Sequence, residues 1–263
     1  MFFRLFFRPR RSGVLDAASF TVFLFGLTDI ASIILTFGVS VGAARAVNWA
    51  VAQYGWPRIE LPAEGVVSLF AGFTLYWLLV SFHGYWGHRL VHTKYFWPLH
   101  RFHHAATELN MVTALRQHPV EPVILSFLGV VSPLLLFKVS DPILFMYLVV
   151  GTFVDLLAHS QLPWSYGWVG WLVTYPRAHQ IHHSIEDEHR DMNFSNCPLW
   201  DRLFGTWYKG TKAPSAYGVP DNQYEISPLR QFCFDALEFY ATAAKGVRAL
   251  FGRRKAPRLP IYK

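Results

Sequence analysis

The sequence predicts an all-α membrane protein with about four transmembrane helices and a cytoplasmic helical cap that carries histidine-rich segments. Of its 263 residues, 52% are hydrophobic and only 16% are charged, whereas about a quarter of the residues in soluble domains are charged. Mean hydropathy over the whole chain is +0.23. The length favours a single domain, which we place at residues 1–263.

Four apolar stretches approach the roughly 18–20 residues that a transmembrane helix requires. The first is long enough to tilt, kink or form a re-entrant pair, and Pro133 interrupts the third. The first is also far longer than a signal-peptide core, so we expect a retained membrane anchor. The stretches run over about residues 14–44, 66–82, 120–137 and 142–158.

Lysine and arginine set the expected orientation. Only Arg45, Arg58 and Lys138 fall on the far side of the membrane, and the rest of the 24 lie on the N-terminal side or in segments joined to it. This positive-inside asymmetry predicts cytoplasmic termini, and it accounts for the net charge of +7 without a nucleic-acid partner. We expect a multi-pass protein of the inner membrane if the source is bacterial, which we favour, or of the endoplasmic reticulum if it is eukaryotic.

Two segments outside the spans have interfacial character. Residues 163–171 are rich in tryptophan but too broken for a fifth span, as is typical of segments at headgroup depth. Residues 229–251 repeat apolar side chains at helical spacing, with Lys and Arg among them. They predict an amphipathic helix, which lies either on an anionic leaflet or against the body of the protein.

The twelve histidines are not scattered, because eight of them fall in three clusters. Residues 88–92 have i,i+4 spacing, which places both rings on one helix face, while residues 100–104 and 179–183 follow the pattern HxxHH. Two single histidines stand at span ends. With these spans all ten face the cytoplasm, and neutral imidazole suits zinc, copper, iron and nickel. The candidate metal ligands are His88, His92, His100, His103, His104, His118, His159, His179, His182 and His183.

The two remaining histidines are expected to be bystanders. His83 lies at the end of the second span, and His189 lies in a charged run that predicts a solvated loop. Nearby carboxylates could orient the ligand rings, Asp155 acting on His159 and Glu121 on His118. Helix capping or interfacial solvation is as good an explanation of both carboxylates. Asp201 and Arg202 are expected to form an ion pair beneath the site.

The order and surroundings of these histidines resemble the membrane fatty acid hydroxylase/sterol desaturase superfamily. Residues 118–121 look like its HPxE element, and His159-Ser160 resembles its HS element. Asn193-Phe194 looks like its asparagine–aromatic pair, and residues 200–206 match its WDRLFGT signature. The resemblance covers about residues 80–210, which we take as the histidine-box core.

The resemblance implies a centre of two iron ions bound by the histidines, with O₂ as co-substrate and a membrane lipid as substrate. Family members act on fatty acyl chains, sterols and related lipids, by chemistry that amino-acid side chains alone cannot supply. Hydroxylation by a monooxygenase is our preferred activity, and desaturation by the same centre is the alternative. A metal transporter is a third candidate, but it needs ionisable residues along its path, and only Asp29 and Asp155 are acidic residues clearly inside the spans, away from their ends.

The electrons for such chemistry must come from a partner. The chain has no dinucleotide-binding glycine motif and no haem-attachment motif, and Cys197 and Cys233 belong to no CxxC motif. We therefore expect an external electron donor, a ferredoxin or a cytochrome with its reductase. The basic cytoplasmic face would suit an acidic carrier.

Overall fold

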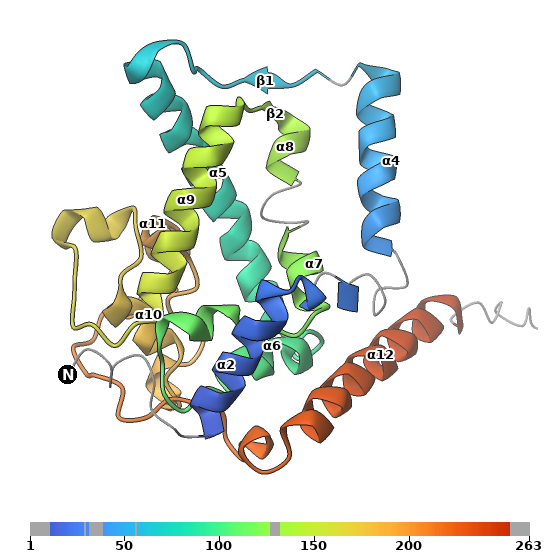
Figure 1. The fold of residues 1–263 in the computed structure, drawn as a ribbon, viewed down its shortest axis with the longest axis vertical. Coiled ribbons are helices and arrows are strands. Elements are labelled where there is room, and N and C mark those ends of the chain that lie inside the picture. Colours follow the sequence, from blue (N-terminus) through green and yellow to red (C-terminus); the bar gives the residue numbers. More distant parts are fainter. Residues whose placement is uncertain (1–10, 29, 32–38, 56, 127–131, 253–263) are drawn as a thin grey trace, which may run out of the picture.

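The computed structural model describes residues 11–28, 30–31, 39–55, 57–126 and 132–252, and this part of the chain is mostly helical with almost no strand (Figure 1). The expected helical architecture is therefore confirmed. Two short strands, β1 (Ile59–Glu60) and β2 (Phe137–Lys138), pair in parallel with Ile59 opposite Phe137. They lie at the end of the molecule where the two longest apolar helices begin.

These two helices are α5 (Gly65–Val91) and α9 (Asp141–Ala158), which pack against each other and run in the same direction (Figure 1). At 1.5 Å per residue α5 measures about 40 Å, enough to cross a hydrocarbon layer of about 30 Å even when tilted, whereas α9 measures about 27 Å, near the lower limit of about 17 residues for a span. Only 28% and 17% of their apolar windows are buried inside the protein. Both helices therefore present most of their apolar surface outwards, as a lipid-facing helix does.

The other two predicted spans are not single helices among the described residues. The stretch 14–44 is divided between α2 (Arg11–Leu24) and α4 (Val39–Tyr54). Gly26 follows α2 with a φ of +66°, a conformation that favours glycine and ends the regular helix. Residues 32–38 lie outside the described residues. Four spans of one helix each are thus not confirmed, and among the described residues two helices are long and apolar enough to cross a membrane.

The third predicted stretch is likewise built from short pieces. It contains α7 (Glu121–Ser126) and α8 (Ser132–Leu136), and residues 127–131 between them are not described. Pro133 lies at the start of α8, where the missing N–H and the fixed φ of proline suit the first turn of a new helix.

A small core joins the middle of α5 to the first turn of α9. Tyr76 and Val80 of α5 pack with Ile143 of α9, and Leu61 covers them from the segment after β1. At Gly72 of α5 an added Cβ would lie 2.0 Å from the Pro62 carbonyl oxygen. Only glycine allows the chain to pass so close to the helix at this point.

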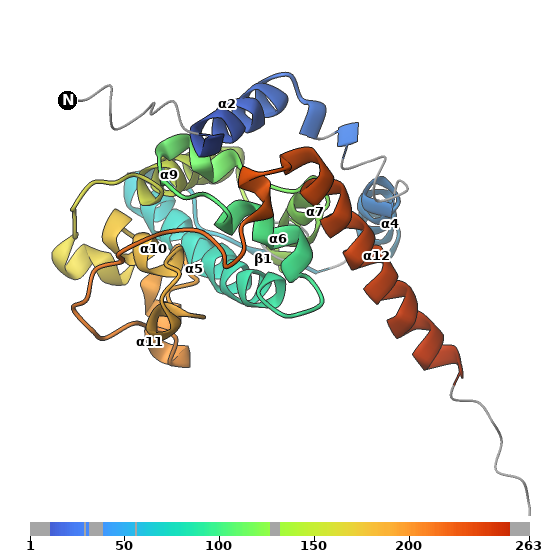
Figure 2. The same ribbon diagram turned by 90° about the horizontal axis from the view of Figure 1, so that it is seen from below.

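The opposite end of α5 and α9 carries the histidine-rich segments. Short helices gather there around the C-terminal turns of the two long ones (Figures 1 and 2). Proline in the first turn of α6, α10 and α11 fixes φ where a helix has no use for the N–H. The elements are α6 (Trp97–His104), α10 (Pro176–His182), α11 (Pro198–Phe204) and the 3₁₀ helices η1 (Met111–Leu115), η3 (Gly167–Trp171) and η4 (Asp187–His189).

The last elements are η5 (Gln223–Glu225) and α12 (Pro228–Gly252), which covers the predicted amphipathic helix. The first part of α12 is fixed to α6, because the buried Asp235 carboxylate accepts hydrogen bonds from Arg101 and from the Tyr224 hydroxyl. Burial raises the pKa of Asp235 to about 6. From there α12 extends away from the body of the molecule (Figure 2).

Candidate metal centre

Nine of the ten predicted ligands converge into two adjoining groups of imidazoles. Within each group the candidate ligand nitrogens all lie within 4.8 Å of one another. We call them group 1 and group 2. Group 1 consists of His88, His92, His100, His104 and His182, and group 2 consists of His103, His159, His179 and His183.

The spacing of the nitrogens matches that of ligands on a shared ion. The Nε2 atom of His100 lies 3.1 Å from that of His88 and 3.1 Å from that of His104. In group 2, the Nε2 atom of His159 lies 2.9 Å from that of His179 and 3.2 Å from that of His103. Two nitrogens bound at about 2.1 Å to one ion are roughly 3.0–3.4 Å apart. The donor atoms therefore fit one metal ion in each group.

Each HxxHH box contributes to both groups. The α6 box gives His100 and His104 to group 1 but His103 to group 2, whereas the α10 box gives His179 and His183 to group 2 but His182 to group 1. Residues four apart share a helix face, while the second histidine of each box, His103 or His182, points to the other group. The rings of His104 and His183 stack with centroids 4.4 Å apart, so the two groups touch.

Burial sets the charge of the rings. Desolvation, followed by the repulsion of neighbouring imidazoles, holds the pKa of His100, His104, His179 and His183 well below the usual value. The neutral imidazole is the form that binds metals. In addition, His92 Nε2 is buried without a hydrogen-bond partner among the described residues, as expected for an atom whose natural partner is a metal ion.

The loop after α10 orients two rings of group 1 through backbone carbonyls. His182 Nδ1 donates to the Met192 carbonyl at 2.8 Å, and His88 Nδ1 donates to the Phe194 carbonyl at 2.7 Å. Between them Asn193 has a φ of 56°, a strained conformation for a residue with a side chain. Its side chain holds the loop by donating to the Ala178 carbonyl at 3.0 Å. Asn193 therefore supports the ligands without touching the centre itself.

Both predicted carboxylates lie beside ligand rings, although not as expected. Glu121 accepts a 2.6 Å hydrogen bond from His100 Nδ1, rather than contacting His118. His159 Nδ1 donates to the backbone carbonyl of Asp155 at 2.8 Å, whereas the Asp155 carboxylate is 3.7 Å away. Either contact fixes the Nδ1–H tautomer and leaves Nε2 free for a metal.

The tenth predicted ligand, His118, lies outside both groups. Its ring is fully buried and stacks on Phe232 of α12, with centroids 4.5 Å apart. Its Nδ1 accepts a 3.3 Å hydrogen bond from the backbone N–H of Val120. Burial lowers the pKa of His118 to about 4. The ring thus contributes to the junction between this loop and α12.

The structure separates the two expected bystanders. His83 Nδ1 donates to the Leu79 carbonyl at 2.7 Å, one turn earlier in α5, and His83 belongs to neither group. The prediction that His189 lies in a solvated loop is wrong, because its side chain is fully buried. It contacts the Ser184 hydroxyl at 2.8 Å and the Tyr208 ring. The turn of η4 directs His189 inwards although its charged neighbours face solvent.

The expected ion pair of Asp201 and Arg202 is replaced by two separate arrangements. The buried Asp201 carboxylate accepts the backbone N–H groups of Phe194 and Ser195, at 2.8 and 2.9 Å. Asp201 thereby holds the segment whose carbonyl orients His88, and burial raises its pKa to about 6. The Arg202 guanidinium instead lies over the rings of Trp171 and Trp207, at 4.1 and 4.0 Å.

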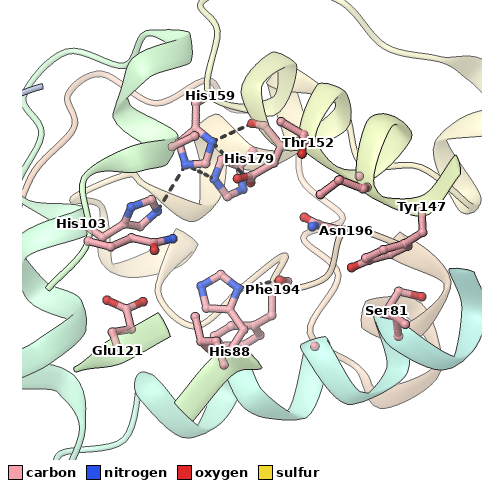
Figure 3. A pocket seen from close by; sticks show the side chains of 18 of the residues that line it. Ser81, His88, His103, Glu121, Tyr147, Thr152, His159, His179, Phe194 and Asn196 are labelled. Carbon is pink, nitrogen blue, oxygen red and sulfur yellow. Dashed lines mark hydrogen bonds and ion pairs between the residues drawn. The ribbon is translucent and has the colours of Figure 1, made fainter. Parts of the chain in front are cut away.

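A cavity of about 360 Å³ extends from the imidazoles between α5 and α9. Figure 3 shows His88, His103, His159 and His179 at one part of it and Tyr147 of α9 at another. Apolar side chains of α5 and α9 form part of its wall, together with Gly84 and Gly151. No sequence motif indicated these lining residues, and the carbonyls that orient the ligands were missed because backbone atoms leave no signal in a residue pattern.

Comparisons with known proteins agree with this geometry. A family model described as fatty acid hydroxylase matches residues 73–206, which contain all nine grouped histidines. The alkylglycerol monooxygenase of Xenopus tropicalis is 28% identical over 70% of this chain and 41% of its own length. The ornithine lipid hydroxylase OlsE of Rhizobium tropici is 27% identical over 71% of this chain and 59% of its own length.

A third relative has a different name. The very-long-chain aldehyde decarbonylase GL1-8 of Oryza sativa is 31% identical over 59% of this chain and 60% of its own length. The chain therefore spans between about two fifths and three fifths of the length of these curated relatives. No solved structure gives a significant match.

Proposed function

The chain belongs to the fatty acid hydroxylase family, and from this premise we propose that it is an O₂-dependent, membrane-bound oxidoreductase that hydroxylates a membrane lipid. One observation carries the proposal. Two adjoining groups of buried imidazoles line a cavity that extends between two apolar helices, each able to cross a membrane. A binuclear metal centre next to a lipid-facing helix pair suits the oxidation of an apolar chain.

In this proposal, group 1 and group 2 each hold one iron ion. Iron would supply the activation of O₂, which side chains cannot perform. The protein's own part is to present neutral imidazoles with Nε2 free for the metal. It does so by hydrogen-bonding Nδ1 of several rings to a carboxylate or a backbone carbonyl. Glu121 engages His100, and the carbonyls of Met192 and Phe194 engage His182 and His88. Such outer partners fix ring orientation and raise ligand basicity.

The cavity provides for the substrate. Trp77 and Val80 of α5 and Leu148 of α9 give it an apolar wall, so an alkyl or acyl chain could lie between the helices. Ser81, Thr152 and Asn196 add a few polar groups able to orient a substrate. The acidic residues of the lining, Glu121 and Asp155, lie beside the ligand rings of His100 and His159. This favours a lipid substrate over a transported ion, which would need ionisable groups along its route.

Electrons are proposed to come from an external donor, a ferredoxin or a cytochrome with its reductase. The formal charge of +7 supports an acidic carrier, since complementary charge speeds encounter between redox partners. The histidine-bearing face would be cytoplasmic if the lysine and arginine asymmetry sets the orientation.

The test compares lipids from cells that express the protein with lipids from cells that lack it, under ¹⁸O₂. Hydroxylation predicts a lipid that has gained one oxygen atom carrying the isotope label. The His182→Ala variant should lose this product and His83→Ala should retain it, because only His182 belongs to a group. A product that has lost two hydrogens and gained no oxygen would instead identify a desaturase. No change in any lipid would contradict both.

A further inference from the structure

A second cavity lies on the side of α10 that faces away from the metal groups. It has a volume of about 410 Å³ and is lined by Arg177, Arg202, Lys209 and Lys212, together with Trp207 and Tyr208. Among the described residues that line it, none is acidic. We call it the basic cavity. Four cationic side chains around one hollow indicate a site for an anion.

Arg202 is the cation of the basic cavity whose position is held by aromatic stacking. Its guanidinium lies between the rings of Trp171 and Trp207, and its Nε is buried without a hydrogen-bond partner among the described residues. The carboxylate beside it in sequence, Asp201, is engaged by the N–H groups of Phe194 and Ser195. A stacked guanidinium keeps a fixed orientation and can bind phosphate oxygens with two parallel hydrogen bonds.

The other three cationic side chains of the basic cavity differ in whether an acidic residue neutralises their charge. Lys212 pairs with Glu188 at 2.5 Å. Arg177 donates to the Thr211 carbonyl at 3.4 Å, an interaction that leaves its charge uncompensated. Lys209 is exposed, and within the described part of the chain neither Lys209 nor Arg177 forms an ion pair within 4.0 Å. Three positive charges therefore remain for a ligand.

The surroundings place the basic cavity at the level of lipid headgroups. Trp164, Trp168 and Trp171 precede α10 and are 50%, 77% and 48% exposed. Exposed tryptophans gather where a membrane meets water, and the candidate span α9 ends at Ala158, a few residues before them. An adjoining cavity of about 500 Å³ shares Arg202, Trp207 and Lys209 and reaches Trp171, so the site continues to the aromatic segment.

We propose that the basic cavity binds the phosphate group of an anionic membrane lipid, at a site separate from the metal centre. The cavity has room for a phosphate-bearing headgroup, and through the adjoining cavity it reaches Trp171 of the aromatic segment. α10 divides the two sites, with Ala178 and Ile181 facing the lipid phosphate and His179 and His182 facing the metals. A lipid bound there would brace the helix that carries the third histidine box.

The test is native mass spectrometry of the purified full-length protein in non-ionic detergent. Phosphatidylglycerol, phosphatidylcholine and inorganic phosphate are titrated separately. The proposal predicts retained phosphatidylglycerol and weaker binding of the other two. The double variant Arg177→Gln/Lys209→Gln should weaken phosphatidylglycerol binding roughly tenfold or more, since each cation contributes to attraction for an anionic lipid. Its metal content should stay that of the wild type.

The matched control removes two exposed cations elsewhere, Lys94→Gln/Arg190→Gln, and should bind phosphatidylglycerol as the wild type does. Arg202→Lys keeps the charge but loses the planar fork, and should also weaken binding, with thermal unfolding showing that the variant is folded. Equal losses in both double variants would overturn the proposal in favour of diffuse charge attraction.

Two other outcomes would also overturn it. Tight binding of inorganic phosphate without binding of phosphatidylglycerol would assign the basic cavity to a soluble anion. Unchanged lipid binding in Arg177→Gln/Lys209→Gln, together with slower reduction by an acidic electron-carrier protein, would make this surface a protein docking site. Loss of metal from His182→Ala bears only on the proposed function, so the two proposals can fail separately.

Discussion

Five imidazoles of the centre, His88, His100, His103, His159 and His182, have Nδ1 within hydrogen-bond distance of a protein oxygen, which leaves Nε2 for a metal. His100 Nδ1 donates a hydrogen bond to Glu121, and His103 Nδ1 lies 3.2 Å from the Arg116 carbonyl. The opposite nitrogens, the Nε2 atoms, then face one another across distances that suit a metal. The partners of Nδ1 should therefore matter for metal binding almost as much as the ligands.

Glu121→Ala tests this at one residue. It removes the acceptor of His100 Nδ1 and leaves the ring free to rotate. We expect metal affinity to fall roughly tenfold to hundredfold, as is common when an outer partner of a ligand is removed. The measurement is metal retained after dialysis against graded chelator. Glu60→Ala, an exposed carboxylate paired with Lys138 at the other end, is the control and should behave as wild type. Equal retention in both variants would rule out the orienting role.

His118→Ala and His189→Ala separate ligands from buried bystanders. Both rings are fully buried but belong to neither group. We expect both variants to keep the metal content of the wild type while losing about 1–3 kcal/mol of stability, because each leaves hydrogen-bonding or packing partners unsatisfied. Elemental analysis and thermal unfolding measure the two effects. Metal loss from either variant, as large as that from His182→Ala, would mean that the partition of the histidines is wrong.

At the scale of elements, helical spacing predicted which histidines share a face but not where that face points. The pair His88 and His92 could be placed on one side of a helix from i,i+4 spacing alone, and both belong to group 1. The split of each HxxHH box between two groups depends on how α6 and α10 pack against each other. That packing is set by contacts between residues far apart in the chain, such as the stacked rings of His104 and His183.

For the apolar spans, too, the sequence predicted part of the structure and tertiary contacts decided the rest. The apolar stretch 66–82 predicted α5, but the helix continues to Val91 and so carries His88 out of the apolar region. A hydropathy profile does not predict this extension, because the added turns contain His83, His88 and Arg89. The stretch 14–44 was apolar enough for one span, yet Ser12 and Asp16 of α2 are buried against η1, where Asp16 accepts from Asn110 at 2.6 Å. Composition could not reveal that contact.

Gly84→Leu tests the cavity between α5 and α9. Gly84 lines the cavity, and a Cβ added there would meet no atom within 4 Å. A larger side chain at this position would therefore project into the cavity. We expect the variant to keep its metal and fold but to lose most lipid turnover, because the substrate path is narrowed. Gly246→Leu on α12 is the matched control, since its Cβ also meets nothing. Full activity of Gly84→Leu would place the substrate elsewhere.

At the scale of the whole molecule, α5 and α9 run in the same direction from the β1–β2 end to the histidine end (Figure 1). Two parallel crossings require the chain to return between them, and α7 and α8 lie on that return. The single-domain boundaries, the retained N-terminal anchor and the orientation stay predictions, because they depend on the membrane and on residues beyond those described.

Reporter fusions at Arg58 and Lys263 test the orientation. Arg58 immediately precedes β1, at the end opposite the histidines, whereas α12 starts beside α6 at the histidine end. Together with the lysine and arginine asymmetry, this predicts reporters on opposite sides of the membrane, with Lys263 cytoplasmic. Finding both reporters on one side would remove the basis for a cytoplasmic histidine face.

The number of metal ions per chain tests the binuclear centre most directly. It is measured by elemental analysis of full-length protein, purified gently without chelator, alongside one variant from each group. The wild type is expected to hold about two ions. His182→Ala in group 1 and His103→Ala in group 2 are each expected to lose metal and to abolish lipid oxidation, because one ion belongs to each group. One ion or none in the wild type, or variants that keep both ions, would contradict the two-group centre.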